Sequence, residues 1–479
     1  MELQLKIASA GELELLKKKV SEILEKRGLR VDHPEMLALA KKRGAVVHED
    51  SGYVKFPARL QSELIANMEK EFTLAGQSEE KDLKIPHPEG LFYPGSVTGC
   101  MHIHEAEGGR RKIQVTDLDE IFQLVDAMEH VNYYSIVTYD AKELPQETTD
   151  INCLYHALGN CGKFGWIQPF DGPNAKYLLE MASVVVGGKE NLAKRPILSP
   201  FSCVTEPFVV KHMDAEVIMA NAEYGVPVFC CAMPTAGANA PITPAGTALV
   251  TIAEVMGLIL LVQCVKPGLP CIAVCEQLML DMKSTFTLQS SIQISAGRIL
   301  NAQFFQDGYG IPAHTFGAGT DAFTPGPQAV ADVMSSSMTA ALGGNLFLQD
   351  AGQVECCKAY SPLQLIVDNE IFGMVKTLKK GMSITEESMG FEEVLGIGEQ
   401  VNFMANPHTF KHFREIFEPS LFNTRSRTKW EADGQPDLYD RALETYRKFK
   451  SDFKPKRLSD DVDAELRKIV AHANKTLGG

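Results

Sequence analysis

Residue types that could do chemistry recur at the ends of short apolar segments in the middle of the chain. They are aromatic rings, a few carboxylates and one carboxamide: Tyr93, Tyr139, Trp166, Phe201, Glu206, Phe229, Glu276, Phe316, Asp321, Phe323, Gln349 and Asp350. No lysine or arginine stands at these positions. An aromatic face attracts a quaternary ammonium ion by about 0.5–2 kcal/mol, and a buried carboxylate would supply the opposite charge. A single ring is more typical of a core, but as a group these residues predict a cage for an organic cation.

The elements that would position this set alternate between strand and helix. Apolar runs typical of strands with both faces covered occur at Leu91–Pro94, Tyr133–Tyr139, Phe164–Gln168, Ile197–Cys203, Pro227–Met233, Cys271–Cys275, Ile311–Phe316 and Asn345–Gln349. Helical patterns occur at residues 116–130, 149–159, 174–186, 207–222, 244–266, 282–305, 326–342 and 361–378. Eight such repeats predict an α/β fold, a (β/α)8 TIM barrel with functional residues at the carboxyl ends of its strands. A doubly wound open sheet would use the same alternation, but eight repeats favour closure.

Two further regions flank the predicted barrel, to which we assign residues 86–380. Residues 1–85 predict an accessory α+β region with amphipathic helices at 12–26 and 34–42, followed by a hairpin with strands at 45–48 and 53–56. Residues 381–479 are polar and charged, and they predict a mainly helical extension with helices at 409–417, 438–453 and 460–474.

Composition narrows the class of protein. The chain has 479 residues, 45% hydrophobic and 23% charged, as in a soluble globular protein. Its net charge of -14 argues against nucleic acid or an anionic membrane as a partner. Eleven cysteines without a secretory hydrophobic region at the N-terminus predict reduced thiols and a cytoplasmic protein. The apolar run 248–265 contains Glu254 and Gln263, which favours a buried helix over a membrane span.

Metal and nucleotide sites are weakly indicated. The pairs Cys230-Cys231 and Cys271-x-x-x-Cys275 lie near strand ends, so zinc bound by thiolates is conceivable, but neither has CxxC spacing. His102 and His104 would share one face of a strand, yet they precede Gly108-Gly109 in what is expected to be an exposed hairpin. The glycine pairs match neither a GxGxxG nor a P-loop pattern. We therefore predict no metal ligands.

Four segments carry a resemblance to a known family. Met233–Gly246, Gly317–Asp321, Gln349–Gly352 and Gln364–Glu370 are similar, in this order, to segments of the trimethylamine methyltransferase superfamily, and the resemblance covers most of the chain. It implies a (β/α)8 barrel that moves a methyl group from an amine to the cobalt of a separate corrinoid protein. The chain lacks the Asp-x-His-x-x-Gly segment with which corrinoid proteins hold cobalt. The cobalamin is therefore expected on a partner, with no tightly bound cofactor here.

The founding members of the superfamily carry pyrrolysine in the loop after the sixth strand. When the similar segments are matched, the position of pyrrolysine falls on Gln328 in this chain. A glutamine amide cannot capture an amine as an electrophilic imine does, so the resemblance points to the branch without pyrrolysine. Members of that branch are similar in using quaternary amines such as glycine betaine, proline betaine or carnitine, which release a neutral tertiary amine. Relatives have histidine at Gln349 and an aromatic residue at Gln353, which leaves the exact substrate open.

The resemblance implies catalytic roles for Asp321, Gln328, Gln349 and Asp350. The aromatic set, with Glu206, Glu276, Asp321 or Asp350, is expected to hold the ammonium head in line for attack by cobalt(I), mainly by positioning and exclusion of water. Expected partners are the cognate corrinoid protein, a small quaternary amine and further copies of the chain as a homo-oligomer. Two alternatives stay open: a zinc-thiolate methyltransferase acting on an alcohol or thiol, and a non-catalytic betaine-binding barrel.

Overall fold

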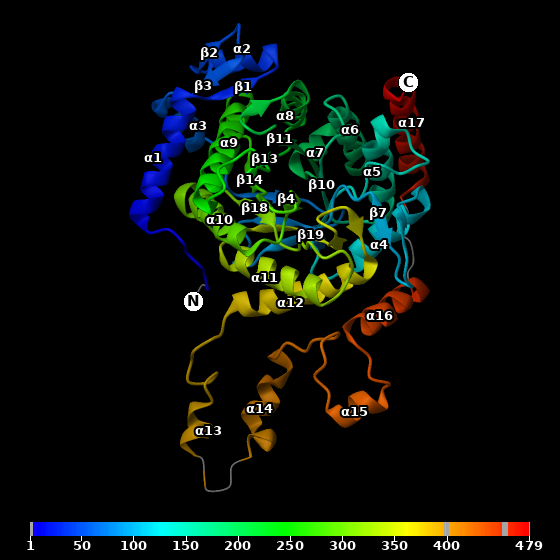
Figure 1. Cartoon of the computed structure of the whole chain (residues 1–479). Coiled ribbons are helices and arrows are strands. Elements are labelled where there is room, and N and C mark those ends of the chain that lie inside the picture. Colours follow the sequence, from blue (N-terminus) through cyan, green and yellow to red (C-terminus); the bar gives the residue numbers. More distant parts are fainter. Residues whose placement is uncertain (1–2, 397, 399–401, 453–457, 479) are drawn as a thin grey trace.

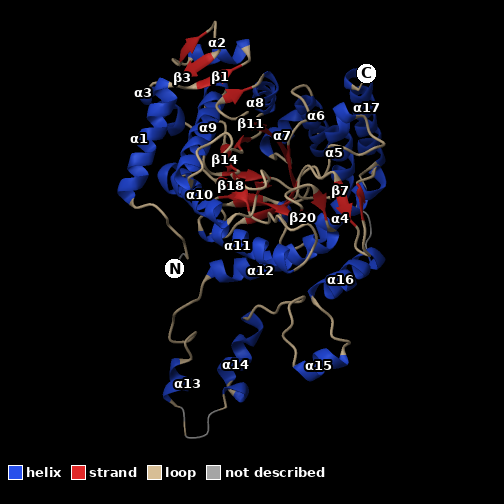
Figure 2. Ribbon diagram, viewed as in Figure 1, coloured by secondary structure: helices blue, strands red, loops and turns tan. Residues whose placement is uncertain are grey.

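A closed barrel of eight parallel strands forms the centre of the molecule (Figures 1 and 2). The computed structural model describes residues 3–396, 398, 402–452 and 458–478. The barrel strands, in chain order, are β6 (Tyr93–Ser96), β9 (Tyr133–Tyr134), β10 (Phe164–Ile167), β11 (Leu198–Cys203), β13 (Val228–Ala232), β15 (Cys271–Cys275), β18 (Ala313–Phe316) and β19 (Phe347–Ala351). Each predicted strand overlaps one of these. The predicted barrel is confirmed, and the open sheet is excluded because β6 pairs with both β19 and β9.

Helices surround the barrel, as Figure 2 shows. They are α4 (Val115–Ala127), α5 (Thr149–Asn160), α6 (Asn174–Val186), α7 (Lys189–Lys194), α8 (His212–Tyr224), α9 (Pro244–Val265), α10 (Ile292–Ala302), α11 (Pro327–Leu342) and α12 (Pro362–Lys380). Local chemistry sets several boundaries. At the start of α9 the Thr243 side chain accepts the Gly246 N–H and Pro244 fills the first turn.

Two predicted helices begin later than expected because extra strands occupy their first residues. Helix α8 begins at His212 because β12 (Val209–Val210) pairs with β1 (Leu29–Val31) of the N-terminal region. Helix α10 begins at Ile292 because β16 (Leu278–Leu280) and β17 (Thr287–Leu288) form a hairpin. This hairpin belongs to the loop after β15, so it lies at the end of the barrel where functional residues are expected.

Helix α9 is the most apolar segment. It is the one helix of the described residues long and apolar enough to cross a membrane, with a mean hydropathy of 2.3, but 83% of that window is buried inside the protein. It packs on β13 and β15 on one side and on the N-terminal region on the other. This is the environment of a core helix, as the sequence predicted.

The N-terminal region covers α9 and closes one end of the barrel. Its elements are α1 (Ala10–Lys26), β1, α2 (Pro34–Lys42), β2 (Val46–His48), β3 (Tyr53–Lys55), α3 (Ala58–Ala66), β4 (Phe72–Leu74), the turn Glu79–Lys81 and β5 (Leu83–Ile85). The predicted helices and hairpin therefore form. Leu74, Leu83 and Ile85 of the β4–β5 hairpin pack against the aromatic rings at the start of the barrel strands. The hairpin seals the amino-terminal end of the barrel.

Short strands also decorate the loops at the opposite end. β14 (Thr235–Ala236) joins the β16–β17 hairpin, and a second small sheet has the order β20-β21-β7-β8. Its members are β20 (Gln353–Val354), β21 (Ala359–Tyr360), β7 (His102–His104) and β8 (Arg110–Lys112). These loops follow β13, β15, β19 and β6, so they surround the carboxyl ends of the barrel strands.

The C-terminal region is partly a layer of the body and partly a projection. Helices α16 (Leu438–Asp452) and α17 (Asp460–Leu477) pack on the barrel helices, where Tyr439 donates to Gln364 Oε1 at 2.8 Å. Between α12 and α16 the chain leaves the body, as Figures 1 and 2 show. This projection carries α13 (Phe391–Leu395), α14 (Pro407–His412) and α15 (Arg427–Ala432), with turns at Phe403–Ala405 and Phe413–Glu415.

Packing inside the barrel yields a stability prediction at Gly95. A Cβ there would lie 2.1 Å from the Tyr133 ring, which cannot move aside because its hydroxyl bonds His314 and Leu348. We expect Gly95→Ala to cost about 1–3 kcal/mol of stability through overpacking. Gly159→Ala in α5 is the control, because no atom lies within 4 Å of its Cβ position. Thermal melting should show a lower midpoint for the Gly95 variant only; equal midpoints would contradict the packing.

Candidate active site

The carboxyl ends of β15, β18 and β19 bring four predicted residues together. Phe316 pairs with Gln349 in the barrel register, Glu276 follows the last residue of β15, and Asp350 lies next to Gln349. All four are buried. The residues expected at the mouth on these three strands are therefore adjacent, although none is open to solvent.

A histidine, His314 of β18, lies at the centre of the aromatic rings. Its ring centroid is 4.8 Å from that of Trp166, 6.1 Å from that of Phe229 and 6.3 Å from that of Phe347. Trp166 in turn stacks on Phe201 at 4.2 Å. The predicted cage of Trp166, Phe201 and Phe229 is thus a closed aromatic stack around an imidazole, because the rings pack on one another and on His314.

The protonation of His314 follows from its neighbours. The Tyr133 hydroxyl donates to the Leu348 carbonyl at 3.2 Å, so it can accept the proton of His314 Nε2, 2.9 Å away. The lone pair of Nδ1 then faces Glu276 Oε1 at 3.6 Å, which is too long for a hydrogen bond. Burial lowers the pKa of His314 to about 3, and burial, followed by the charge of Asp350, raises the pKa of Glu276 well above its usual range. We infer a neutral imidazole beside a protonated carboxyl.

Asp350 is held in a strained backbone position. Its φ of 86° lies in a region that residues other than glycine seldom adopt, and the barrel register shifts between Leu348 and Ala351. Gln289 donates its amide to Asp350 Oδ2, and Gln353 donates to Gln289 Oε1 at 2.8 Å. Burial raises the pKa of Asp350 to about 7. A carboxyl that titrates near neutral pH at the end of a barrel strand is a candidate for function.

A buried arginine, Arg298 of α10, completes the cluster. Its Nη2 donates to the Gln289 and Gln277 carbonyls at 2.6 and 3.2 Å, and its guanidinium lies 5.5 Å from the Phe316 ring centre. Burial lowers its pKa to about 10, against the opposite charges of Asp350 and Glu276, so it stays protonated at neutral pH. No lysine or arginine stands at a barrel strand end in the predicted set, and this arginine comes from a helix instead.

Unpartnered polar atoms are concentrated in this cluster. Those without a hydrogen-bond partner include both amide atoms of Gln349, Glu276 Oε1, Asp350 Oδ1, Arg298 Nε and Nη1, and Trp166 Nε1. Buried polar atoms are nearly always paired in proteins, so such a concentration needs an explanation. A ligand with both donors and acceptors would satisfy these atoms. This cluster of one cation, two acids and a carboxamide is the candidate active site.

Three predicted aromatic residues lie elsewhere. Tyr93 begins β6 rather than ending it, so its hydroxyl donates to the Lys84 carbonyl at 2.9 Å at the sealed end of the barrel. Tyr139 donates to the Gln168 carbonyl at 2.8 Å in a loop. Phe323 is 73% exposed on the rim. The structure does not bring these three rings together with the buried cluster, because strand boundaries and loop paths differ from those assumed.

Three predicted polar residues are near the rim. Glu206 accepts the Met233 N–H at 2.6 Å between two loops, and burial raises its pKa. Asp321 accepts the N–H groups of Gln289 and Ser290 at 2.9 and 3.0 Å, so it fixes the loop whose Gln289 bonds Asp350. Gln328 is exposed at the start of α11. Of the catalytic set, Gln349 and Asp350 thus lie in the cluster, Asp321 supports it, and Gln328 lies outside.

The cysteines and histidines considered as metal ligands do not converge at the mouth. Cys230 and Cys271 face α9, whereas Cys231 faces the barrel interior. His104 instead contacts Glu355 at 2.8 Å in the β7–β8 hairpin. Among the described residues one group, His33 with His212 and Glu216, places three potential ligand atoms within 4.8 Å of one another. His33 Nδ1 accepts the Met36 N–H at the start of α2, which leaves Nε2 as its potential ligand atom.

A closed parallel barrel with a buried polar cluster at the carboxyl ends of its strands defines a (β/α)8-barrel enzyme. The sequence profile described as trimethylamine methyltransferase (MTTB) matches residues 3–478, and the chain belongs to this family. The protein is a methyltransferase that takes methyl groups from amines, as the names of its relatives indicate.

Relatives with two different substrates in their names match nearly the whole chain. Trimethylamine methyltransferase MttB of Desulfitobacterium hafniense (strain DSM 10664 / DCB-2) is 28% identical over 95% of this chain and 92% of the relative. MttB of Methanosarcina barkeri (strain Fusaro / DSM 804) is 27% identical over 99% and 97%. Glycine betaine methyltransferase of D. hafniense (strain Y51) is 26% identical over 98% of each chain. These similar identities do not favour one substrate.

Solved structures support the fold. The hydroxylamine complex of MtmB and the M. barkeri monomethylamine methyltransferase MtmB each match with a TM-score of 0.52 and 12% identity over 92% of both chains.

Several residues of the cluster were missed from the sequence. Strand periodicity could have identified His314, since it lies two residues before Phe316 on the same face of a strand. Helical periodicity could have identified Arg298, because it follows Ile294 by one helical turn on the buried face of α10. No sequence pattern could have identified Gln289, because it lies in a loop whose path depends on tertiary contacts.

The pKa of Asp350 predicts a pH-dependent stability difference. Because the folded pKa of about 7 exceeds the unfolded value of about 3.9, ionisation disfavours the folded state. The penalty should grow by about 1.4 kcal/mol per pH unit between these values and stay constant above pH ~7. Asp350→Asn removes it, so the melting midpoint of the variant should rise relative to wild type from pH ~5 to ~7 and then level off. A difference that is flat across this range would contradict the assignment.

Proposed function

We propose that this methyltransferase acts on a zwitterionic quaternary amine of the betaine class and passes the methyl group to a corrinoid carried by a separate protein. The observation that carries the proposal is Arg298, a fully buried cation with two unpartnered nitrogen atoms beside the acids Glu276 and Asp350. A substrate with only a positive charge would leave this arginine unpaired, whereas a substrate with a carboxylate would pair with it.

The two ends of a betaine match the two charges of the cluster. Arg298 Nε and Nη1 lie on different edges of the guanidinium, and each can donate a charge-assisted hydrogen bond to a carboxylate oxygen. Asp350 and Glu276 suit the ammonium end, since a cation close by lowers the pKa of a carboxyl and favours its charged form. The Gln349 amide, with both of its atoms free, can bond the substrate as donor or acceptor. Arg298, Gln349, Asp350 and Glu276 are therefore the proposed substrate contacts.

The reaction needs little acid-base chemistry from the protein. When the carbon–nitrogen bond of a quaternary amine breaks, the electron pair stays on nitrogen and a neutral tertiary amine leaves without a proton. The neutral state of His314 agrees with this requirement. The reduced corrinoid supplies the two electrons of the new bond to the methyl carbon. Positioning of the methyl group and exclusion of water remain for Gln349, Asp350 and the aromatic stack.

Residues on the rim of the barrel could bind a partner protein at the mouth. Exposed apolar side chains stand on the loops after β13, β15 and β18: Met233, Ile242, Met282, Phe286 and Phe323. Ile242 and Met282 both lie beside Gly237, so residues of two loops form a common surface. Exposed apolar groups that cluster around an entrance mark protein-binding sites. This surface fits a corrinoid protein that presents its cofactor to the cluster.

We assign the chemistry to residues 86–380, with residues 1–85 and 381–479 as structural additions. A cytoplasmic location agrees with eleven cysteines that are all free thiols.

The function is tested by mixing the protein with a cobalt(I) corrinoid and single amines while visible spectra are recorded. Glycine betaine, proline betaine or carnitine should produce a methylated corrinoid and the matching tertiary amine, and trimethylamine should react far more slowly. Equal or faster reaction of trimethylamine would overturn the substrate class. Stoichiometric zinc with activity lost on chelation would favour the zinc-thiolate alternative. Tight betaine binding in calorimetry without methyl transfer would favour the binding barrel.

A substitution at Arg298 tests the carboxylate contact. Arg298→Lys keeps the charge but replaces the planar guanidinium, with its two unpartnered nitrogen atoms, by one ammonium group. We therefore expect kcat/KM for the betaine substrate to fall at least ~30-fold, which is about 2 kcal/mol. Tetramethylammonium, which has no carboxylate, is the control substrate and should lose much less. An equal loss for both substrates would show that Arg298 acts only by holding the Gln277 and Gln289 carbonyls.

A further inference from the structure

Two histidines and one glutamate lie together where the N-terminal region meets the barrel helix α8. His33 is at the start of α2, and His212 and Glu216 belong to α8. One potential ligand atom from each residue lies within 4.8 Å of those from the other two. None of the three residues belongs to the candidate active site, so the group needs an explanation of its own.

Paired strands bring the two histidines together. β1 and β12 run parallel with Val31 opposite Val210, and the Asp32 N–H donates to the Val210 carbonyl at 2.9 Å. Both segments turn into helices directly after this pairing, which places His33 and His212 at neighbouring helix starts (Figure 1). Their rings stack with centroids 4.6 Å apart. The fold therefore holds the two imidazoles side by side.

The position of the carboxylate suits a zinc ion. His212 and Glu216 are four residues apart in α8, so they share one face of the helix. His212 Nε2 is 3.5 Å from Glu216 Oε1. This distance is longer than a good hydrogen bond, but it is close to the ~3.4 Å between two ligands of a tetrahedral zinc ion with bonds of ~2.1 Å. The carboxylate also packs closely on Gly172, where a Cβ would lie 2.0 Å from Glu216 Oε2.

The second nitrogen of each ring has a partner in the protein. His212 Nδ1 lies 3.2 Å from the Asp32 carbonyl, which holds the ring proton there and leaves the Nε2 lone pair for a metal. His33 Nδ1 accepts the Met36 N–H at 3.2 Å, so the neutral ring carries its proton on Nε2. A metal at this Nε2 takes the place of the proton. Even the loss of the α2 cap would be a small cost beside the free energy with which zinc binds structural sites.

The group borders an acidic cavity. The cavity has a volume of about 970 Å³, and both His33 and Glu216 line it. Its other charged lining residues are Glu35, Lys176, Glu180 and Glu223. An excess of carboxylates around a recess raises the local concentration of cations. A water molecule from the cavity can supply a fourth ligand.

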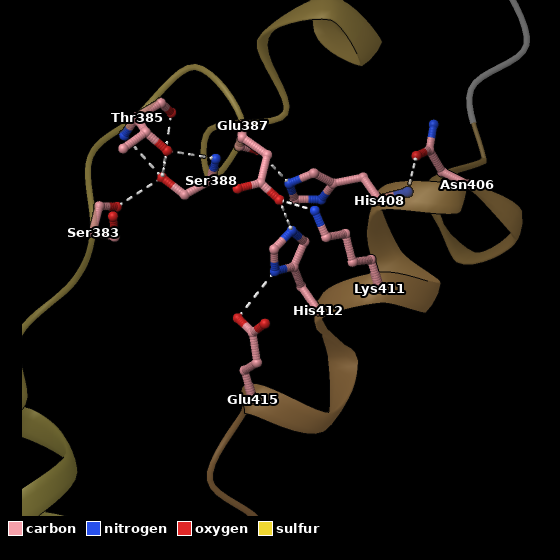
Figure 3. A network of polar contacts seen from close by, with 9 residues as sticks. All are labelled: Ser383, Thr385, Glu387, Ser388, Asn406, His408, Lys411, His412 and Glu415. Carbon is pink, nitrogen blue, oxygen red and sulfur yellow. Dashed lines mark hydrogen bonds and ion pairs between the residues drawn. The ribbon is translucent and has the colours of Figure 1, made fainter.

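A comparable pair of histidines is already satisfied by the protein. The rings of His408 and His412 in α14 have centroids 4.4 Å apart. Figure 3 shows that the neighbouring Glu387 carboxylate pairs with Lys411, and that His408 Nε2 contacts the Glu387 carbonyl at 2.9 Å. A lysine ammonium thus provides the positive charge there. The ionic neighbour of Glu216 is instead a histidine of the same group.

We propose that His33, His212 and Glu216 bind a divalent transition-metal ion of the zinc class. Zinc accepts two imidazoles and one carboxylate and fills its fourth position with water. The ion joins the start of α2 to α8 and so fastens the N-terminal region to the barrel. The inference is independent of the proposed amine substrate, because the site shares no residue with the candidate active site.

The first test measures zinc binding to reduced, chelator-treated full-length protein by calorimetry. Removal of a ligand should weaken binding at least ~10-fold, since changes in the outer shell of a metal site already cost that much. His212→Ala and Glu216→Gln are the test variants, and the His212 side chain is 59% exposed, so its loss should not unfold the protein. His472→Ala is the control, because His472 lines the same cavity outside the group. Equal binding by all four proteins would mean an adventitious ion only.

Cobalt(II) distinguishes this site from the eleven free cysteines of the chain. Thiolate ligands give cobalt(II) strong near-ultraviolet absorption, whereas nitrogen and oxygen ligands give weak visible bands. One equivalent of cobalt(II) should produce weak visible bands in wild type and in His472→Ala, and these bands should be lost in His212→Ala. Strong near-ultraviolet absorption that persists in His212→Ala would place the ion on cysteines and refute the proposal.

The second test uses thermal melting. An ion that binds only the folded protein stabilises it, so zinc should raise the melting midpoint of wild type and of His472→Ala but not that of His212→Ala. A similar rise in His212→Ala would argue against the site. A chelator should leave the rate of methyl transfer unchanged, in contrast to the zinc-thiolate alternative, and a rate lost on chelation would contradict the assignment. Failure of methyl transfer with every amine would refute the proposed function but not these zinc results.

Discussion

The burial of unlike charges inside a closed barrel is the constraint on which the rest of the structure depends. Arg298, Glu276 and Asp350 lie where water does not reach, so each must be neutralised, paired or hydrogen-bonded. The surrounding loops serve this need. Asp321 fixes the loop of Gln289, and Gln289 donates to Asp350. The Gln277 and Gln289 carbonyls both accept from Arg298 Nη2. The polar atoms that remain without a hydrogen-bond partner are those that a substrate would contact.

The fold could be predicted from the sequence because a parallel sheet covered on both faces requires apolar runs at regular intervals. Those runs identified all eight barrel strands, and closure followed from their number. The boundaries of α8 and α10 were wrong because β12 and the β16–β17 hairpin form only through partners distant in sequence or in a loop. Local propensity contains no information about such partners.

The site was predicted in part. Whether a residue was predicted or missed depends on the element that brings it to the site. Glu276, Gln349 and Asp350 come directly from strand ends, so the barrel rule placed them. Arg298 arrives from a helix, which that rule does not cover. Tyr93 was misplaced because a shift of the strand by two residues moved it to the other end of the barrel. Gln328 was chosen by resemblance alone, and its exposed position at the start of α11 shows that matching a motif does not fix where a side chain lies.

The β4–β5 hairpin has a consequence for the order of events in turnover. Since it packs against the rings at the amino-terminal end, a substrate would reach the cluster from the carboxyl end of the barrel. Under the proposed chemistry the methyl acceptor covers that same end. The tertiary amine then stays bound until the acceptor protein dissociates. Release of the amine must therefore come last, and the exchange of acceptor proteins limits the rate of the catalytic cycle. A fold with one sealed end thereby imposes a compulsory sequence of binding and release.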